Sequence, residues 1–275
     1  MHPMLNIGVR AARRAGDLIV RHINQLDAIK IDSKGRYDFV SEVDRMAEDD
    51  IIRTVQRSYP DHAFLAEESG ASAGSTDAEY VWIIDPLDGT TNFLHGFPVF
   101  CVSIAVMHRG RLEHGVIYDP LRQELFTASR GAGATVDGRK MRVSDARLLE
   151  KSLIGTGYPY KQDSAWLDAY MGMLKSVIQE TSGVRRPGAA ALDLAYVAAG
   201  RLDGFWEIGL NIWDIAAGVL MIQECGGIVT DLVGRDGWQQ NGNVVAGNPK
   251  IHEALIQLIE PHLTPELRAQ PPAGS

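Results

Sequence analysis

The chain has 275 residues, of which 45% are hydrophobic and 23% are charged, and its formal net charge is −8 at pH 7. This composition is typical of a globular protein, and the length allows one large domain or two interlocked halves. The negative charge argues against generic binding to nucleic acid or to anionic membranes, because both ligands carry the same sign of charge. An acidic chain instead suits a protein that gathers carboxylates around cations.

The two cysteines, Cys101 and Cys225, lie in apolar stretches. We interpret them as buried reduced thiols rather than as a disulfide framework, which favours the cytoplasm. No stretch approaches the ~18 apolar residues of a transmembrane helix. The N-terminal region also lacks the continuous apolar core of a signal peptide. The sequence therefore predicts a cytoplasmic protein without a membrane segment.

The first half of the chain is predicted to contain two helices and several short strands. An apolar stripe from Leu5 to Ile23 predicts the first helix, and a capping box of Ser41 and Asp44 starts the second. Further expected features are a hairpin or loop at 30–37, an exposed Gly/Ser-rich loop at 70–79, and strands at 62–66, 81–84, 99–107, 112–118 and 124–128. Connections between residues 99 and 142 are short, which predicts an antiparallel sheet.

The second half alternates helices with strands, which favours a mixed sheet. Strands are expected at 153–156, 183–185, 203–207, 228–231 and 244–246, and helices at 167–178, 189–199, 214–225 and 249–259. The tail from Pro261 is rich in proline and is expected to fray. Because the pattern changes near residues 145–152, we divide the chain into halves 1–147 and 148–275 within one compact unit.

The most informative stretch is 81–93, Val-Trp-Ile-Ile-Asp-Pro-Leu-Asp-Gly-Thr-Thr-Asn-Phe. Its apolar start predicts a buried strand that ends at Asp85, because Pro86 keeps the preceding residue extended. Asp85 and Asp88 would then lie at the rim of the sheet. Carboxylates in this position suit a divalent cation. An ordinary turn, with Asp88 capping the next element, is the structural alternative.

The backbone after these carboxylates suits an anion. Gly89 allows a close approach, and the amides of Gly89 and Thr90 predict an anion-binding helix start. A cation that holds a phosphate would satisfy both features.

Two more acidic elements lie at junctions between expected elements. Glu67 follows a strand, and Asp214 opens a helix. A solvated Glu67 and a helix-capping Asp214 are the structural alternatives. Junctions are nevertheless where functional residues tend to gather, so we group these carboxylates with those of the 81–93 stretch.

Together these motifs resemble the inositol monophosphatase family. The segment Asp-Pro-Leu-Asp-Gly-Thr at 85–90 is similar to the first family signature. The other matching motifs are a Glu-Glu segment at 65–69 and a second signature at 213–218 with 224–228. A stretch at 183–195 is most similar to the bacterial SuhB-like branch. The resemblance runs from the loop at Lys34 to Asn248.

The resemblance implies an α/β fold. More specifically, it implies a layered α-β-α-β-α sandwich with an antiparallel sheet in the first half. It also implies a homodimer that hydrolyses inositol monophosphate or similar polyol phosphates with two to three Mg²⁺ ions, and inhibition by lithium. The first metal would be held by Glu67, Asp85, the Leu87 carbonyl and Thr90. The second would be held by Asp85, Asp88 and Asp214, and Glu67 would share a third. All-oxygen donors agree with Mg²⁺.

The resemblance also assigns catalytic roles to Thr90, Asp44 and Glu67. Thr90 and Asp44 would orient a water for in-line attack, while the amides of Gly89 and Thr90 cradle the phosphate. Asp44 is equally well explained as the third residue of its capping box.

Substrate contacts are expected on both sides of the phosphate. Asp88 and Asp214 lie on the metal side, while the polyol hydroxyls would meet Glu207 and the backbone at Gly188 and Ala190. The alternative interpretation of Glu207 is an exposed glutamate at the end of a strand, without a role in binding. Lys34 corresponds to the mobile loop lysine of the family, although a lysine at a loop tip is more often simply solvated.

Two other functions stay open. A phosphatase of the same superfamily that acts on fructose bisphosphate or a 3′-phosphoadenosine nucleotide would need an added basic cluster, for which Lys161 and the Arg185-Arg186 pair are the candidates. Proteins of the SuhB branch are also associated with transcription antitermination complexes. In that role Arg185-Arg186 would lie at a dimer or partner surface, and the partners would be RNA polymerase and Nus elongation factors.

Overall fold

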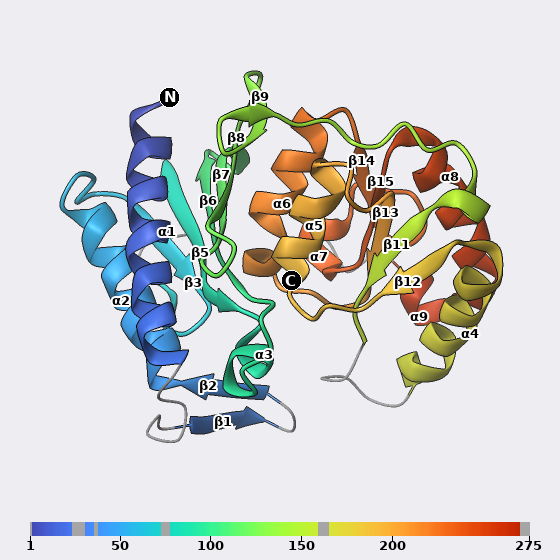
Figure 1. The fold of residues 1–275 in the computed structure, drawn as a ribbon, viewed down its shortest axis with the longest axis horizontal. Helices are drawn as coiled ribbons and strands as arrows, with labels where there is room; N and C mark the ends of the chain where they lie inside the picture. The colour runs from blue at the N-terminus through green and yellow to red at the C-terminus, as the bar shows by residue number, and fades with distance from the viewer. Residues whose placement is uncertain (1, 24–30, 36–37, 73–77, 159–164, 270–275) are drawn as a thin grey trace.

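The computed structural model describes residues 2–23, 31–35, 38–72, 78–158 and 165–269. Helices and sheets alternate in five layers across the molecule, as Figure 1 shows from left to right. The predicted α-β-α-β-α sandwich is confirmed. Within these ranges, none of the helices combines the length and the apolar character that crossing a bilayer requires.

Helices α1 (Pro3–His22) and α2 (Glu42–Gln56) form the first layer and cover one face of the larger sheet (Figure 1). Each presents a stripe of buried small and aliphatic residues to the sheet, including Ala12 and Ile19 of α1 and Ile51 of α2. An ion pair between Arg14 and Asp50, with 2.6 Å between nitrogen and oxygen, joins the two helices near their solvent side.

The larger sheet has eight strands. In spatial order they are β10 (Arg139–Lys140), β9 (Gly133–Val136), β8 (Glu124–Ser129), β7 (Arg111–Asp119), β6 (Cys101–His108), β5 (Tyr80–Asp88), β3 (Ala63–Ala66) and β4 (Gly70–Ala71). Side chains of β5 alternate between its two faces, so Trp82 and Ile84 pack against α1 and α2 while Ile83 packs on the opposite side.

Two predictions about this sheet need correction. The antiparallel pairing predicted for residues 99–142 is confirmed from β6 to β10, but the sheet is not antiparallel throughout, because β3 pairs with β5 in parallel, with Ala63 opposite Val81. Segment 67–79 connects β3 to β5 and supplies the long connection that a parallel pair requires. That segment also begins with β4, which pairs with β3, so Gly70 and Ala71 are not part of an exposed loop.

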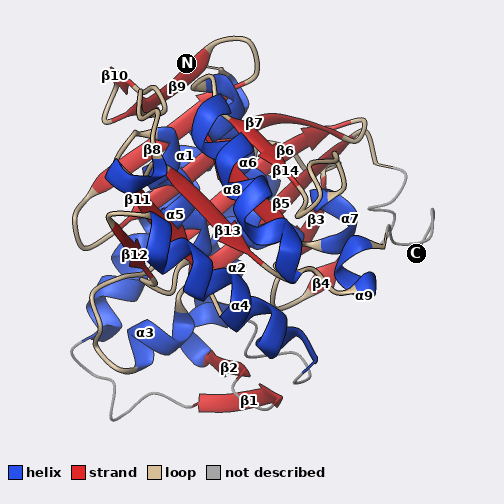
Figure 2. Cartoon of the chain, turned by 90° about the vertical axis from the view of Figure 1, so that its right-hand side faces the viewer, coloured by secondary structure: helices blue, strands red, loops and turns tan. Residues whose placement is uncertain are grey.

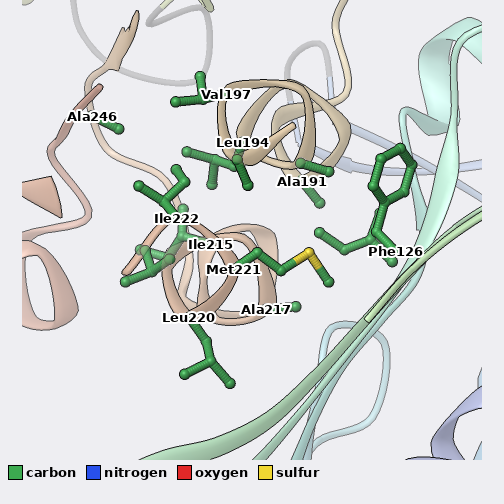
Figure 3. Packing of buried hydrophobic residues seen from close by; sticks show 14 of the residues in the cluster. Phe126, Ala191, Leu194, Val197, Ile215, Ala217, Leu220, Met221, Ile222 and Ala246 are labelled. Atoms are coloured by element: carbon green, nitrogen blue, oxygen red, sulfur yellow. The ribbon is translucent and has the colours of Figure 1, made fainter. Parts of the chain in front are cut away.

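The middle layer consists of α5 (Ala190–Ala198) and α6 (Ile212–Glu224), which pack between the two sheets. Figure 3 shows Leu194 and Ala191 of α5 on the side that faces α6, which carries Ala217 and Met221, and Phe126 of the larger sheet lies at the edge of this group. A β-carbon on Gly218 would collide with the Leu194 side chain, so glycine sets the close approach of the two helices.

The second sheet has five strands, in the order β12 (Gly183–Arg185), β11 (Leu153–Thr156), β13 (Gly204–Glu207), β15 (Val244–Gly247) and β14 (Ile228–Thr230). Strands β12, β11 and β13 are parallel and the others are antiparallel, so the predicted mixed sheet is confirmed. The outer layer is formed by α4 (Ala165–Glu180) and α8 (Pro249–Ile259), which lie on the far side of this sheet (Figure 1). The change of sheet falls between β10 and β11, and the division at residue 147 stays a proposal.

Shorter elements complete the described chain: η2 (Leu149–Lys151), α7 (Trp238–Asn241), η3 (Glu260–His262) and α9 (Pro265–Arg268). The tail from Pro261 was predicted to fray, but this is wrong as far as residue 269. Leu263 and Leu267 are buried in the cluster beneath α4 and α8, and their burial offsets the entropy of ordering the segment. Residues 270–275 lie outside the described ranges.

A small antiparallel hairpin of β1 (Ile31–Gly35) and β2 (Asp38–Ser41) lies beside the short helix α3 (Thr90–Leu94), as Figures 1 and 2 both show. The hairpin expected at 30–37 is therefore present. Lys34 belongs to β1, and its side chain lies outside the description.

Candidate active site

Strand β5 carries the Asp-Pro-Leu-Asp motif at its end. The strand was predicted to end at Asp85, but its pairing with β6 resumes at Asp88, opposite Cys101, after an irregularity in the register. Proline has no amide hydrogen, so the ladder is interrupted at Pro86 rather than terminated. Asp85 is 1% exposed, and its carboxylate accepts a hydrogen bond of 3.0 Å from the Leu87 amide.

Gly89 makes the turn from β5 into α3. Its φ is 94°, in the left-handed region, and a β-carbon there would lie 2.9 Å from the Val99 carbonyl oxygen. Both facts require glycine. Asp88 does not cap the following helix, because no side chain caps the N-terminus of α3. Its carboxylate instead accepts a hydrogen bond of 2.8 Å from the Ala191 amide at the start of α5.

Thr90 is held by α2. Its hydroxyl donates to Asp44 Oδ1 at 2.8 Å and also lies 3.1 Å from the Leu87 carbonyl oxygen. Asp44 Oδ2 accepts from the amide and the hydroxyl of Ser41, which confirms the predicted capping box. Burial raises the pKa of Asp44, while the bonds from Ser41 and Thr90 oppose that rise. Asp44 therefore caps the helix and also holds Thr90, while its catalytic role stays a prediction.

Glu67 reaches the same sheet edge as Asp85 because β3 and β5 are parallel. The Glu67 amide donates to the Ile84 carbonyl oxygen at 3.1 Å, which extends the pairing of these strands. The turn that follows is held by Glu48 of α2, which is 3% exposed and accepts from the amides of Glu68 (2.8 Å) and Ser69 (2.9 Å). Sequence reasoning missed Glu48; its only signal was a glutamate on the apolar face of a predicted helix.

Asp214 enters the site from α6. The helix was predicted to begin at Asp214, but it begins at Ile212, with Asn211 as the N-cap. Asp214 is the third helical residue, and its Oδ2 accepts from the Asn211 amide at 2.7 Å. The alternative that Asp214 caps the helix is therefore partly right. Asp214 is not the N-cap residue, but it supplies the acidic side chain of the capping box.

These elements surround one cavity of about 360 Å³. Among the described side chains of the predicted site, all line it except Asp44, which contacts Thr90 instead. The predicted residues that line the cavity are Glu67, Asp85, Leu87, Asp88, Gly89, Thr90, Gly188, Ala190, Glu207 and Asp214. Residues that the sequence did not suggest also line it, among them Asn92, Tyr158, Asp193 and Asn211.

The Arg185-Arg186 pair is divided by the structure. Arg186 lines the cavity, with its guanidinium 4.9 Å from the centre of the Tyr158 ring. Arg185 ends β12, is exposed, and donates to the Val184 carbonyl oxygen at 3.0 Å. Arg186 is exposed as well, so both side chains are placed to serve an outer surface, and Arg186 is the one of the pair that also lines the cavity. Lys161 lies outside the described ranges.

Asn92 joins the two sides of the cavity and was also missed. Its side-chain amide donates to the Val99 carbonyl oxygen at 2.7 Å and to the Pro187 carbonyl oxygen at 2.8 Å. These contacts connect α3 in the first half of the chain with the segment after β12 in the second half.

The carboxylates of the cavity raise one another's pKa. The pKa of Asp85 lies well above its usual range, first because of burial and then because of the charges of Glu67, Asp88 and Asp214. Burial raises the pKa of Asp88 to about 7, against the opposing bond from the Ala191 amide. A bound cation would stabilise the charged forms of these groups.

The residues present fit Mg²⁺. The donors are carboxylates, a carbonyl and a hydroxyl, which are the oxygen ligands that this ion prefers. In the described part of the chain, no three His, Cys, Asp or Glu side chains form a ready-made group of metal ligands. The protein thus offers an open cavity lined with oxygen rather than a closed cage, and Mg²⁺ commonly completes its coordination with water and substrate phosphate in such sites.

The comparisons with known proteins agree with this geometry. The model of the inositol monophosphatase family matches residues 1–264. The chain belongs to the inositol monophosphatase family. The Nus factor SuhB of Pseudomonas aeruginosa is 54% identical over 270 residues, which is 98% of this chain and 100% of that protein.

Solved structures place the chain in the same family. The extragenic suppressor protein suhB of Bartonella henselae superposes with a TM-score of 0.91 at 46% identity, over 94% of this chain and 99% of that chain. The inositol monophosphatase of Anabaena superposes with a TM-score of 0.80 at 39% identity, over 94% of this chain and 95% of that chain. The resemblance to the SuhB-like branch of the inositol monophosphatase family is confirmed.

Proposed function

We propose that the protein is a Mg²⁺-dependent phosphomonoesterase that hydrolyses inositol monophosphate or similar polyol phosphates. The observation that carries this proposal is the meeting of Glu67, Asp85, Asp88 and Asp214 with Glu207 around one cavity. Acidic oxygen donors on one side suit metal-assisted phosphate chemistry, and an acceptor of hydroxyl hydrogens on the other suits a polyol. The family of the chain favours the same chemistry.

The metal ligands are proposed from the family resemblance and from the cavity. Glu67, Asp85, the Leu87 carbonyl and Thr90 would hold one Mg²⁺ ion, Asp85, Asp88 and Asp214 a second, and Glu67 would share a third. When bound, these ions would supply charge stabilisation for the phosphate and for the leaving oxygen. Inhibition by lithium is part of the same proposal.

Thr90 is proposed to orient the attacking water. Its hydroxyl hydrogen is engaged by Asp44, so its oxygen lone pairs are the groups left to accept a hydrogen bond from a water in the cavity. Gly89, which must be glycine, lets the backbone there approach the phosphate closely. Because these groups are already fixed in place, little free energy is needed to reorganise them during the reaction.

The polyol is proposed to lie against the second half of the chain, near Gly188, Ala190 and Glu207. The backbone amide of Ala190 already hydrogen-bonds Asp88, as does that of Ala191. These two amides therefore position a carboxylate at the centre of the cavity, and Glu207 is left as the main hydroxyl acceptor among the proposed contacts.

A substrate panel tests this function. Phosphate release would be measured from inositol 1-phosphate, glycerol 2-phosphate, fructose 1,6-bisphosphate and 3′-phosphoadenosine 5′-phosphate, each with Mg²⁺ and with excess EDTA. We expect Mg²⁺-dependent release, fastest from the polyol monophosphates. A preference for either bisphosphate would favour the superfamily alternatives, for which Arg186 would be the basic contact. Release that persists in EDTA would contradict the proposal.

A role in transcription is the second candidate, and it rests on the name of the relative from P. aeruginosa, Nus factor SuhB. We infer that the protein binds RNA polymerase together with Nus elongation factors, alongside its catalytic activity. A pull-down with purified polymerase and elongation factors tests this role, with the variant Asp85→Asn as a control that separates binding from catalysis.

The homodimer stays a prediction, as does the cytoplasmic location, which is supported by the two free, buried cysteines.

A further inference from the structure

Asp193 is a buried carboxyl group in the wall of the cavity for which the proposed mechanism has no use. It lies in the first turn of α5, its side chain is 1% exposed, and it is among the residues that line the cavity. Within the described part of the chain, its Oδ1 has no hydrogen-bond partner.

A buried aspartate outside the cavity provides a comparison. Asp231 is 3% exposed, and its Oδ1 accepts from the amides of Val233 (3.0 Å) and Arg235 (2.8 Å). A buried polar atom without a partner is destabilising, and each such atom in a native protein calls for an explanation, such as strain, a functional role or a bound water or ion. Asp193 therefore differs from Asp231, because its Oδ1 lacks the hydrogen bonds that the Oδ1 of Asp231 receives.

The surroundings of Asp193 suit a neutral ligand with several hydroxyl groups. Burial, and then the charges of Glu207 and Asp88, raise its pKa well above the usual range, while Arg186 acts in the opposite sense. A carboxyl group in such a setting can both donate and accept a hydrogen bond. Glu207 and Arg186 line the same cavity. Together with Asp193 they are polar side chains in the part of the wall that the second half of the chain forms.

We propose that Asp193 is a specificity residue that binds a hydroxyl of the polyol next to the hydroxyl taken by Glu207, so that the two side chains together recognise a vicinal diol. This inference rests on the proposed phosphatase function and deepens it. It predicts that the preferred substrates are phosphate monoesters whose alcohol carries two neighbouring hydroxyl groups remote from the phosphate. A site built to bind such groups discriminates against analogues that lack them.

The test compares two substrates. Inositol 1-phosphate carries the diol, and p-nitrophenyl phosphate carries no hydroxyl group on its leaving group. In Asp193→Leu we expect kcat/KM for inositol 1-phosphate to fall at least about tenfold, the effect of losing one hydrogen bond in a buried site, and kcat/KM for p-nitrophenyl phosphate to change little. Asp193→Asn retains a donor and an acceptor and should recover part of the loss.

Thermal stability separates this role from a structural one. Because Asp193 has an unsatisfied atom, Asp193→Leu should keep or raise the Tm. The matched control, Asp231→Asn, removes charge from a satisfied buried aspartate off the cavity, so it should lower the Tm and leave the substrate preference unchanged. An equal fall on both substrates, no fall on either, or a fall in Tm together with activity on both would overturn the inference.

A binding measurement distinguishes failure of this inference from failure of the proposed function. If the wild-type protein hydrolyses neither substrate, the proposed function fails. Free myo-inositol would then be tested as a ligand by its effect on the Tm. A shift in the wild-type protein that is lost in Asp193→Leu would support the diol site, whereas an equal shift in both proteins, or none in the wild type, would overturn it.

Discussion

The hydroxyl of Thr90 lies 2.8 Å from the Asp44 carboxylate, although 46 positions separate the two residues. This contact joins the start of α3 to the N-terminal cap of α2, and Ser41 completes it by donating to the other oxygen of Asp44. A helix cap, normally a purely structural device, here fixes the rotamer of a hydroxyl in the wall of the cavity. The position of the Thr90 hydroxyl therefore depends on how α2 begins.

Replacing Thr90 tests the proposed role of its hydroxyl. In Thr90→Ala we expect kcat to fall by about 100-fold or more, because the group proposed to orient the water is lost, while KM changes little. Thr90→Ser keeps the hydroxyl and should retain most of the activity. Steady-state kinetics with inositol 1-phosphate measure both constants. A loss confined to KM would show that Thr90 only binds substrate.

Asp85→Asn should separate stability from activity. The buried Asp85 carboxylate is repelled by Glu67, Asp88 and Asp214, so removing its charge should keep or raise the Tm in EDTA. The same change should abolish Mg²⁺-dependent phosphate release and reduce the rise in Tm that Mg²⁺ causes in the wild-type protein. Melting curves in EDTA and across a Mg²⁺ titration measure this. An unchanged Mg²⁺ effect would refute Asp85 as a ligand, and Asp214→Asn tests the second position in the same way.

Glu48→Ala should loosen the turn that carries Glu67. The two amides that Glu48 accepts would lose their partner, which is expected to lower the free energy of unfolding by about 1–3 kcal/mol. The Mg²⁺ concentration for half-maximal activity should also rise, since Glu67 would be less well placed. Asp49→Ala, an exposed neighbour on the same helix, is the control and should change neither quantity. Loss of stability without a change in the Mg²⁺ requirement would limit Glu48 to a structural role.

Gly157→Ala should alter the polyol end of the cavity while leaving the fold intact. A β-carbon on Gly157 would collide with the carboxylate of Glu207, and that carboxylate is the mobile end of a flexible side chain. We therefore expect a small change in Tm and a several-fold rise in KM for inositol 1-phosphate. Gly183→Ala is the control, because its β-carbon would make only ordinary contacts. Equal KM values in the two variants would contradict the role of Glu207.

His114 gives the stability a pH dependence unrelated to the cavity. Burial lowers its pKa to about 4, from 6.5 for the free side chain. The unfolded chain therefore binds more protons than the folded one between these values, so stability falls as the pH drops from about 6.5 towards 4. His114→Gln should flatten the dependence of Tm on pH in that window. His95→Gln, at an exposed position, should leave it unchanged; an unaltered slope in His114→Gln would contradict the assignment.

The layers of the fold could be predicted because they depend on local pattern. Hydrophobic spacing located α1, α2, α6 and most strands, and short connections indicated antiparallel pairs. The parallel pairing of β3 with β5 could not be read in this way, since it depends on where segment 67–79 returns the chain. The order of the tail was missed for a similar reason, because the burial of Leu263 and Leu267 depends on partners in α4 and α8.

Most carboxylates that line the cavity could be predicted, because they belong to motifs at strand and helix ends. The residues that were missed act through the fold. Asn92 matters because it reaches Pro187 across the cavity, and Glu48 because it faces a turn in a distant segment. Asp193 was quoted within a motif but had no assigned role, since its missing partner is visible only in three dimensions.

The division of the cavity between distant segments has a consequence for protein synthesis. Glu67, Asp85 and Asp88 leave the ribosome long before Asp214 and Glu207, and the α6 helix that carries Asp214 packs between the two sheets. A nascent chain thus displays an acidic cluster whose remaining wall has not yet been translated. The cavity closes only after residue 214 has emerged and α6 has docked, so a truncated translation product that folds its first half would be inactive.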